Sequence, residues 1–278
     1  MCSFLGLSYI PDDLEYINEF NASRGPDSTN ILHFKGHCFA HNLLSITGVY
    51  TEQPFVQNDV IALFNGEIYN FESFGVDCKS DGEIILPLYE QYGPSFASKL
   101  DGEFAIVICD FPKKEILFIT DAFATKPLWY TFEDNRLGFA SYESVLKRSS
   151  FETAIKAPAN STLVFDIESG IQKDTMRNFS FDLRQYKTSY DDWLAAFSES
   201  IRKRTNNLRE KVYIGLSSGY DSAVIACELT KQLIPFKSYS IKGKEDENII
   251  LQRHRLLRER SQEVEMIYLT SEQYTNSR

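Results

Sequence analysis

The chain has 278 residues, of which 43% are hydrophobic and 24% are charged, and its formal net charge is −10. This composition is typical of a globular protein with one or two domains. The acidic balance argues against a protein that binds nucleic acid through a basic face, and no apolar run is long enough to suggest a membrane protein. Five scattered cysteines and the lack of a signal-peptide pattern favour reduced thiols in the cytoplasm.

Short β-type segments dominate the chain up to about residue 166. They are rich in Phe, Ile, Val and Tyr, and they cover residues 2–9, 31–45, 59–69, 103–111, 115–122 and 161–169. Helical patterns over 11–20 and 80–93 interrupt them. The second begins with Ser80 and Glu83 at capping-box spacing, and Pro87 is expected to kink it. Many antiparallel strands with flanking helices predict an α+β protein with two stacked sheets between helices.

Three of the four histidines fall in one β-type segment. His33, His37 and His41 alternate in phase within residues 31–45, and this period predicts that they share one face of a single strand. Their spacing does not match a metal-ligand pattern, so we expect no metal site.

The pattern changes after about residue 170. A connector leads to a helix over 189–205, and strands over 212–216, 236–241 and 264–269 then alternate with helices. Such alternation predicts a parallel sheet. In the last helix, over 246–261, Leu256 and Leu257 are expected to face inward. We therefore expect a first domain over 1–188 and a partial α/β domain over 189–278.

Cys2 directly follows the initiator methionine, and its position alone leaves two interpretations open. It can be a buried apolar cysteine that stands there by chance. Alternatively, removal of Met1 makes it the mature N-terminus, with a thiol nucleophile and a free α-amine on one residue.

Three polar stretches favour the second interpretation. They are SRGPDS at 23–28, LFNGEIYN at 63–70 and KSDGEIIL at 79–86. Together with Cys2 they resemble the class II glutamine amidotransferase domain of glutamine-hydrolysing asparagine synthetases. The resemblance continues at 101–110, 120–130 and 138–146, so it covers about the first 180 residues. It implies the N-terminal-nucleophile fold, an αββα sandwich with two antiparallel sheets between helices.

The resemblance implies a catalytic role for three residues. Cys2 would attack the side-chain carboxamide of glutamine and form a thioester while ammonia leaves. Its own α-amine, with a reference pKa of about 7.7–8.0, can serve as the base. The Asn65 side-chain amide and the Gly66 backbone N–H would stabilise the tetrahedral oxyanion.

The same resemblance assigns the substrate-binding residues. Asp81 would hold the α-ammonium of glutamine, Glu67 would line the same pocket, and Arg24 and Ser45 belong to the predicted substrate site. One position departs from the family pattern, because Leu43 stands where an Arg of the type His-x-Arg-Leu-Ser-Ile would clamp the α-carboxylate. Weak glutamine binding, a repositioned anchor and a different amide donor all stay open.

A second motif lies between a predicted strand and a helix. The stretch VYIGLSSGYDSAVIACEL at 212–229 contains a loop of the kind that presents backbone N–H groups to an anion. A plain helix N-cap by Ser218 or Asp221 is an equally open interpretation. The loop resembles the Ser-Gly-Gly-x-Asp-Ser loop of the asparagine synthetase family, which implies a site for ATP with Mg²⁺. The residues implied are Leu216, Ser217, Ser218, Gly219, Asp221, Ser222 and Ile241.

The resemblance predicts a glutamine-dependent amidotransferase that supplies ammonia to an ATP-activated carboxylate, such as that of aspartate. Family synthetase domains continue beyond this chain, so we expect the synthetase half to be incomplete. Three explanations stay open: a second chain or a homo-oligomer completes it, it packs against the first domain, or the sequence is a truncation. The alternative is a non-catalytic or regulatory remnant that binds nucleotide or a partner chain. A relative of the β-lactam-forming synthetases is disfavoured, because those enzymes have lost the nucleophilic cysteine.

Overall fold

A computed structural model describes residues 2–206, 208–243, 245–269 and 273. The chain divides into two compact units, Met1–Leu183 and Arg184–Arg278. Each unit is described by itself.

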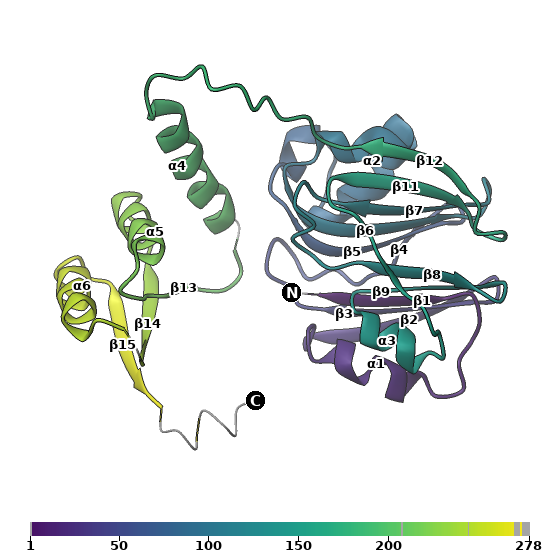
Figure 1. Ribbon diagram of the computed structural model, residues 1–278, viewed down its shortest axis with the longest axis horizontal. Helices are drawn as coiled ribbons and strands as arrows, with labels where there is room; N and C mark the ends of the chain where they lie inside the picture. Colours follow the sequence, from purple (N-terminus) through teal and green to yellow (C-terminus); the bar gives the residue numbers. More distant parts are fainter. Residues whose placement is uncertain (1, 207, 244, 270–272, 274–278) are drawn as a thin grey trace. The chain divides into compact units, whose positions relative to one another are not determined.

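The first unit is a four-layer sandwich (Figure 1). Two six-stranded antiparallel sheets are stacked in the middle. Helices α1 (Leu14–Ala22) and α3 (Glu143–Arg148) cover the outer face of one sheet, and α2 (Ile85–Tyr92) covers that of the other. This arrangement confirms the predicted αββα fold.

The strand orders place the first strand in the interior of its sheet. The first sheet has the order β10 (Ile155–Lys156), β8 (Trp129–Glu133), β9 (Arg136–Ala140), β1 (Ser3–Leu7), β3 (His37–Leu43) and β2 (Ser28–Phe34). The second sheet has the order β12 (Gln172–Arg177), β11 (Ser161–Asp166), β7 (Glu115–Thr120), β6 (Gly102–Asp110), β5 (Val60–Ile68) and β4 (Phe55–Gln57).

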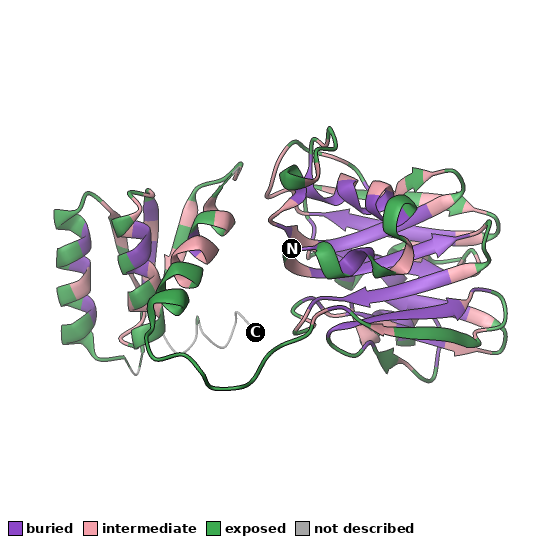
Figure 2. Ribbon diagram, turned by 90° about the horizontal axis from the view of Figure 1, so that it is seen from above, coloured by how far each residue is buried: buried purple, intermediate pink, exposed green. Residues whose placement is uncertain are grey.

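The core between the two sheets is built from alternate residues of their strands. It includes Phe4, Phe39, Leu63, Val107 and Phe118, all buried. Figure 2 shows buried residues along the strands of both sheets. Because side chains alternate along a strand, the residues between them point to the outer layers. The Cys2 side chain thus lies on the face of Phe4, toward the second sheet.

Two sequence predictions for this unit are wrong in detail. Residues 31–45 do not form one strand, because Lys35 (φ 48°) and Gly36 (φ 81°) turn the chain between β2 and β3. Two successive residues with positive φ match the twist of an antiparallel hairpin. His33 therefore lies on a different strand from His37 and His41.

The predicted helix over 80–93 is also divided. A 3₁₀ helix (η2, Asp81–Ile84) precedes α2, and Pro87 lies in the first turn of α2, where its missing N–H breaks no helical hydrogen bond. The predicted capping contact is present, because Glu83 accepts a hydrogen bond from the Ser80 N–H at 3.3 Å. Two more 3₁₀ helices are η1 (Phe71–Phe74) and η3 (Gly93–Lys99).

The second unit contains the predicted parallel sheet. Strands β13 (Val212–Gly215), β14 (Phe236–Lys242) and β15 (Glu263–Tyr268) alternate with α5 (Tyr220–Lys231) and α6 (Glu247–Glu259), after α4 (Asp191–Thr205). In α6, Leu257 is buried as predicted, whereas Leu256 is 54% exposed. None of the described helices is long and apolar enough to cross a membrane.

Candidate active site

Cys2 lies at the start of β1 and is 8% exposed. Its Sγ accepts a hydrogen bond from the Leu44 N–H at 3.4 Å and lies 3.6 Å from the Leu44 carbonyl oxygen. Burial raises the pKa of the Cys2 thiol to about 11, and the negative charges of Glu67 and Asp81 add to this rise. The thiol is therefore protonated at neutral pH, and a base must take its proton before it can act as a nucleophile.

The edge of β5 that lacks a strand partner lies near Cys2. Strand β4 pairs with β5 only over residues 60–62, so the edge is free of strand partners beyond Ala62. Phe64 and Ile68 turn their N–H groups to this edge, where they donate to Gln53 Oε1 at 2.9 Å and to Asp81 Oδ2 at 2.8 Å. Because backbone groups alternate sides along a strand, the N–H of Gly66 points to this edge too.

Position 66 requires glycine, because the backbone of β5 approaches β6 closely there. A Cβ atom at this position would lie 2.2 Å from the Glu103 carbonyl oxygen and 2.7 Å from Phe104 Cα. Any side chain would therefore push β5 away from β6, so the sequence Asn-Gly positions this stretch of the strand edge.

Asn65 is 1% exposed, and its side chain faces the core between the sheets, as those of Ile61 and Leu63 do. Within the described part of the chain, neither its Nδ2 nor its Oδ1 has a hydrogen-bond partner. An unbonded buried amide costs stability, and its two polar atoms could each bond to a ligand.

Two carboxylates lie near the Gly66 edge. Asp81 is 7% exposed and begins η2. Glu67 accepts a hydrogen bond from Thr47 Oγ1 at 2.5 Å. Burial raises the pKa of both carboxyls, and the charge of Glu67 raises that of Asp81 further. Burial and the charge of the neighbouring acid disfavour the ionised carboxylates, which a nearby cation would stabilise.

The Cys2 thiol, the Gly66 edge and the two carboxylates surround one cavity of about 30 Å³, whereas Asn65 is not among its lining residues. Cys2, Ser45, Gly66, Glu67 and Asp81, all predicted from the sequence, line it. Leu43 lines it as well, and the described lining residues include neither Lys nor Arg.

Arg24 does not line this cavity. Its guanidinium lies over the ring of Tyr142, 5.5 Å from the ring centre. The prediction that Arg24 belongs to the substrate site therefore gains no support from the lining of the cavity.

In the second unit, a network of hydrogen bonds orders the serine-rich loop after β13. Ser222 Oγ accepts from the Ser217 N–H at 3.0 Å, and Ser217 Oγ accepts from the Gly219 N–H at 3.1 Å. The Glu245 carboxylate accepts from the Ser218 N–H at 2.6 Å and from the Ser218 hydroxyl. The loop donors at Ser218 thus hold an anionic group of the chain itself.

The structure does not support the alternative interpretation of this loop as a helix N-cap formed by Ser218 or Asp221. Gly219 is the N-cap of α5, and no side chain caps it, so neither Ser218 nor Asp221 has that role. Arg253 donates to the Gly219 carbonyl oxygen at 2.9 Å and connects the loop to α6.

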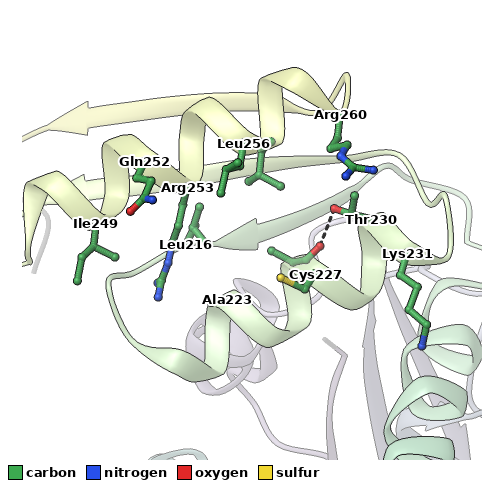
Figure 3. A pocket seen from close by; sticks show the side chains of 12 residues that line it. Leu216, Ala223, Cys227, Thr230, Lys231, Ile249, Gln252, Arg253, Leu256 and Arg260 are labelled. Atoms are coloured by element: carbon green, nitrogen blue, oxygen red, sulfur yellow. Dashed lines mark hydrogen bonds between the residues drawn. The ribbon is translucent and has the colours of Figure 1, made fainter.

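Leu216 and Ile241, both predicted beside a nucleotide, have side chains on different faces of the parallel sheet. Leu216 is buried and lines a cavity of about 620 Å³ between α5 and α6 (Figure 3). Ser240 faces α6, because its hydroxyl lies 2.8 Å from His254 Nε2. The neighbouring Ile241 must therefore point to the opposite face, where it is 53% exposed.

A family model described as a glutamine amidotransferase domain matches residues 1–180. The chain belongs to this family. It is 28% identical over 289 residues to asparagine synthetase [glutamine-hydrolyzing] 1 of Bacillus subtilis, which covers 87% of this chain and 46% of that protein. It is 31% identical over 229 residues to asparagine synthetase [glutamine-hydrolyzing] 2 of Oryza sativa subsp. japonica, covering 77% of this chain and 38% of that protein.

The amidotransferase spans about half the length of the first curated relatives that it matches. Among solved structures, it is similar to the glutamine phosphoribosylpyrophosphate amidotransferase of B. subtilis, which was determined in complex with ADP and GMP. The TM-score is 0.54 at 14% identity, and the match covers 96% of this chain and 81% of that one. This likeness confirms the N-terminal-nucleophile fold.

Sequence reasoning missed several residues that shape the amidotransferase site. His41 and Gln53 hold the backbone of Phe64, Thr47 holds Glu67, and the backbone of Leu44 contacts the thiol. Only His41 carried a signal, since it stands at the His position of the motif that contains Leu43. The other three act through contacts between segments that the sequence alone does not bring together.

Proposed function

We propose that this amidotransferase hydrolyses glutamine to glutamate and ammonia, with Cys2 as the mature N-terminal residue. The observation that carries the proposal is one cavity that joins the Cys2 thiol, the Gly66 edge and two carboxylates, beside an unbonded buried amide on Asn65. A buried amide without a partner lowers the stability of the fold, but the same amide can donate a hydrogen bond to an oxyanion.

In the proposed reaction, the Cys2 sulfur attacks the carboxamide carbon of glutamine, and a C–S bond forms. The carbonyl oxygen becomes an oxyanion that accepts hydrogen bonds from Asn65 Nδ2 and the Gly66 N–H. The C–N bond then breaks, and the leaving nitrogen receives the proton that the base took from the thiol, so that ammonia is released. Water hydrolyses the thioester, which releases glutamate and restores the thiol.

The α-amine exposed by removal of Met1 is the proposed base. The thiol needs one, because burial raises the pKa of Cys2 to about 11. A free α-amine titrates at about 7.7–8.0, close to working pH, and on the same residue it needs no other side chain to position it. Met1 itself lies outside the described residues.

Asp81 and Glu67 are the proposed partners of the α-ammonium of glutamine. A cation between them would relieve their mutual repulsion and stabilise both ionised forms. A cavity of about 30 Å³ holds little more than a water molecule, so glutamine enters only when the lining segments move apart.

For the second unit, we propose that ATP binds at the loop over Ser217–Ser222. Donors that hold the Glu245 carboxylate are suited to a phosphate group, which supports the fit of the residues present. ATP, with Mg²⁺, would activate a carboxylate acceptor such as aspartate for attack by ammonia.

A non-catalytic role is the second candidate, favoured by Leu43 at the anchor position and by the narrow cavity. One experiment separates the two. The purified protein is treated with a glutamine analogue that carries an electrophilic ketone in place of the carboxamide, and the N-terminal peptide is then analysed by mass spectrometry. Labelling of a terminal Cys2, blocked by excess glutamine, supports the enzyme. A retained Met1, or a free Cys2 that is never labelled, contradicts it.

A further inference from the structure

His41 lies on β3, in the layer between the two sheets, and is 1% exposed. Its Nε2 lies 2.9 Å from the Phe64 carbonyl oxygen on β5. We propose that His41 is a positioning residue that fixes the separation of the Cys2 nucleophile and the Asn65–Gly66 oxyanion site, because its hydrogen bond joins the two sheets that carry them. The inference rests on the proposed glutaminase function.

The strand register places both ends of this hydrogen bond beside the reacting groups. His41 pairs with Phe4 on β1, two residues after Cys2. Its acceptor, Phe64, immediately precedes Asn65 on β5. Cys2 and Asn65 belong to different sheets, so no backbone ladder sets their distance. The hydrogen bond of His41 spans this gap directly.

The chemistry of the acceptor defines the state of the imidazole. A carbonyl oxygen can only accept, so Nε2 must carry the proton and Nδ1 must be the unprotonated nitrogen. Within the described residues, His41 Nδ1 has no hydrogen-bond partner. Burial lowers the pKa of His41 to about 4, so the ring is neutral at pH 7 and too weakly basic to serve as the general base.

The backbone of Phe64 is held at both its polar groups. Gln53 Oε1 accepts a hydrogen bond from the Phe64 N–H at 2.9 Å, while His41 donates to its carbonyl oxygen. Side chains thus replace the strand partner that β5 lacks beyond Ala62. Two such bonds fix the strand immediately before the oxyanion donors, which are effective only when they are placed correctly.

The test compares three variants of the full chain in glutamine hydrolysis. His41→Leu removes the donor, and we expect kcat to fall about 10- to 100-fold with a much smaller change in KM. His41→Gln keeps a donor at the same reach and is expected to return kcat to within a few-fold of wild type. His37→Leu, on the same strand but away from the cavity, is the matched control.

Two results overturn the inference. One is a folded His41→Leu protein with the kcat of wild type. The other is an equal loss in His41→Leu and His41→Gln, which indicates a structural role without hydrogen bonding. If the wild-type protein releases no glutamate at all, the proposed function has failed instead.

A second measurement needs no variant to fold. NMR of the ¹⁵N-labelled wild-type ring is expected to show the tautomer protonated at Nε2, with no titration near neutral pH. A proton on Nδ1, or titration near the ordinary value of 6.5, contradicts the inference whatever the kinetics show.

Discussion

The substitution Asn65→Leu is expected to change stability and activity in opposite directions. Both polar atoms of the Asn65 side chain are buried without a hydrogen-bond partner among the described residues. An unsatisfied buried group costs about 1–3 kcal/mol, so Leu at this position should raise the free energy of unfolding by about 1–3 kcal/mol. Loss of one oxyanion donor should lower kcat by about 10²- to 10³-fold.

Urea unfolding and glutamate release measure the two effects. The matched control is Asn42→Leu, the same exchange at a residue that is also buried. Asn42 bonds to Asn18, Ser3 and Thr29, so its loss should destabilise the fold. A destabilised Asn65→Leu protein with undiminished kcat would refute the assignment of Asn65 to the oxyanion site.

Three further predictions follow from the same site and from the loop in the second unit. Leu43→Arg should lower KM for glutamine about 10-fold or more, because a charge-assisted bond to a carboxylate contributes about 1.5–3 kcal/mol; an unchanged KM places the anchor elsewhere. Burial and the charge of Glu67 raise the pKa of Asp81 in the folded protein. The fold is therefore more stable when Asp81 is protonated, and this stability is lost as the pH rises through the raised pKa. Asp81→Asn should therefore raise Tm at pH 7 and abolish glutamine binding, and a lower Tm at pH 7 contradicts this sign. Glu245→Ala should tighten ATP binding in calorimetry, because it frees the donors of Ser218; weaker binding would mean that Glu245 supports the nucleotide.

The local pattern of apolar and turn residues was sufficient to predict many of the strands and helices. Strand β6 is a nearly continuous buried run, and the sequence already showed it as apolar between turns. The hairpin at Lys35 and Gly36 was missed, because the in-phase spacing of His33, His37 and His41 indicated one strand and outweighed the turn signal of Gly36. The sequence pattern predicted that Pro87 kinks a helix over 80–93, whereas α2 begins at Ile85 and Pro87 lies in its first turn, where proline is tolerated.

The site was predictable where motif residues follow one another and unpredictable where distant segments meet. Gly66 and Asp81 border one cavity, as the motifs indicated. The packing of Arg24 on Tyr142 depends on a neighbour far along the chain. The opposite directions of Leu216 and Ile241 depend on the register of the parallel strands, which only the folded sheet defines.

The central claim is that Cys2 is the nucleophile of a working glutaminase. The most direct test measures glutamate and ammonia release from glutamine by protein whose N-terminal mass shows that Met1 has been removed, beside the Cys2→Ala variant. We expect equal amounts of both products from the processed protein and none from Cys2→Ala. No release from a protein with a free Cys2, or equal release from Cys2→Ala, would contradict it.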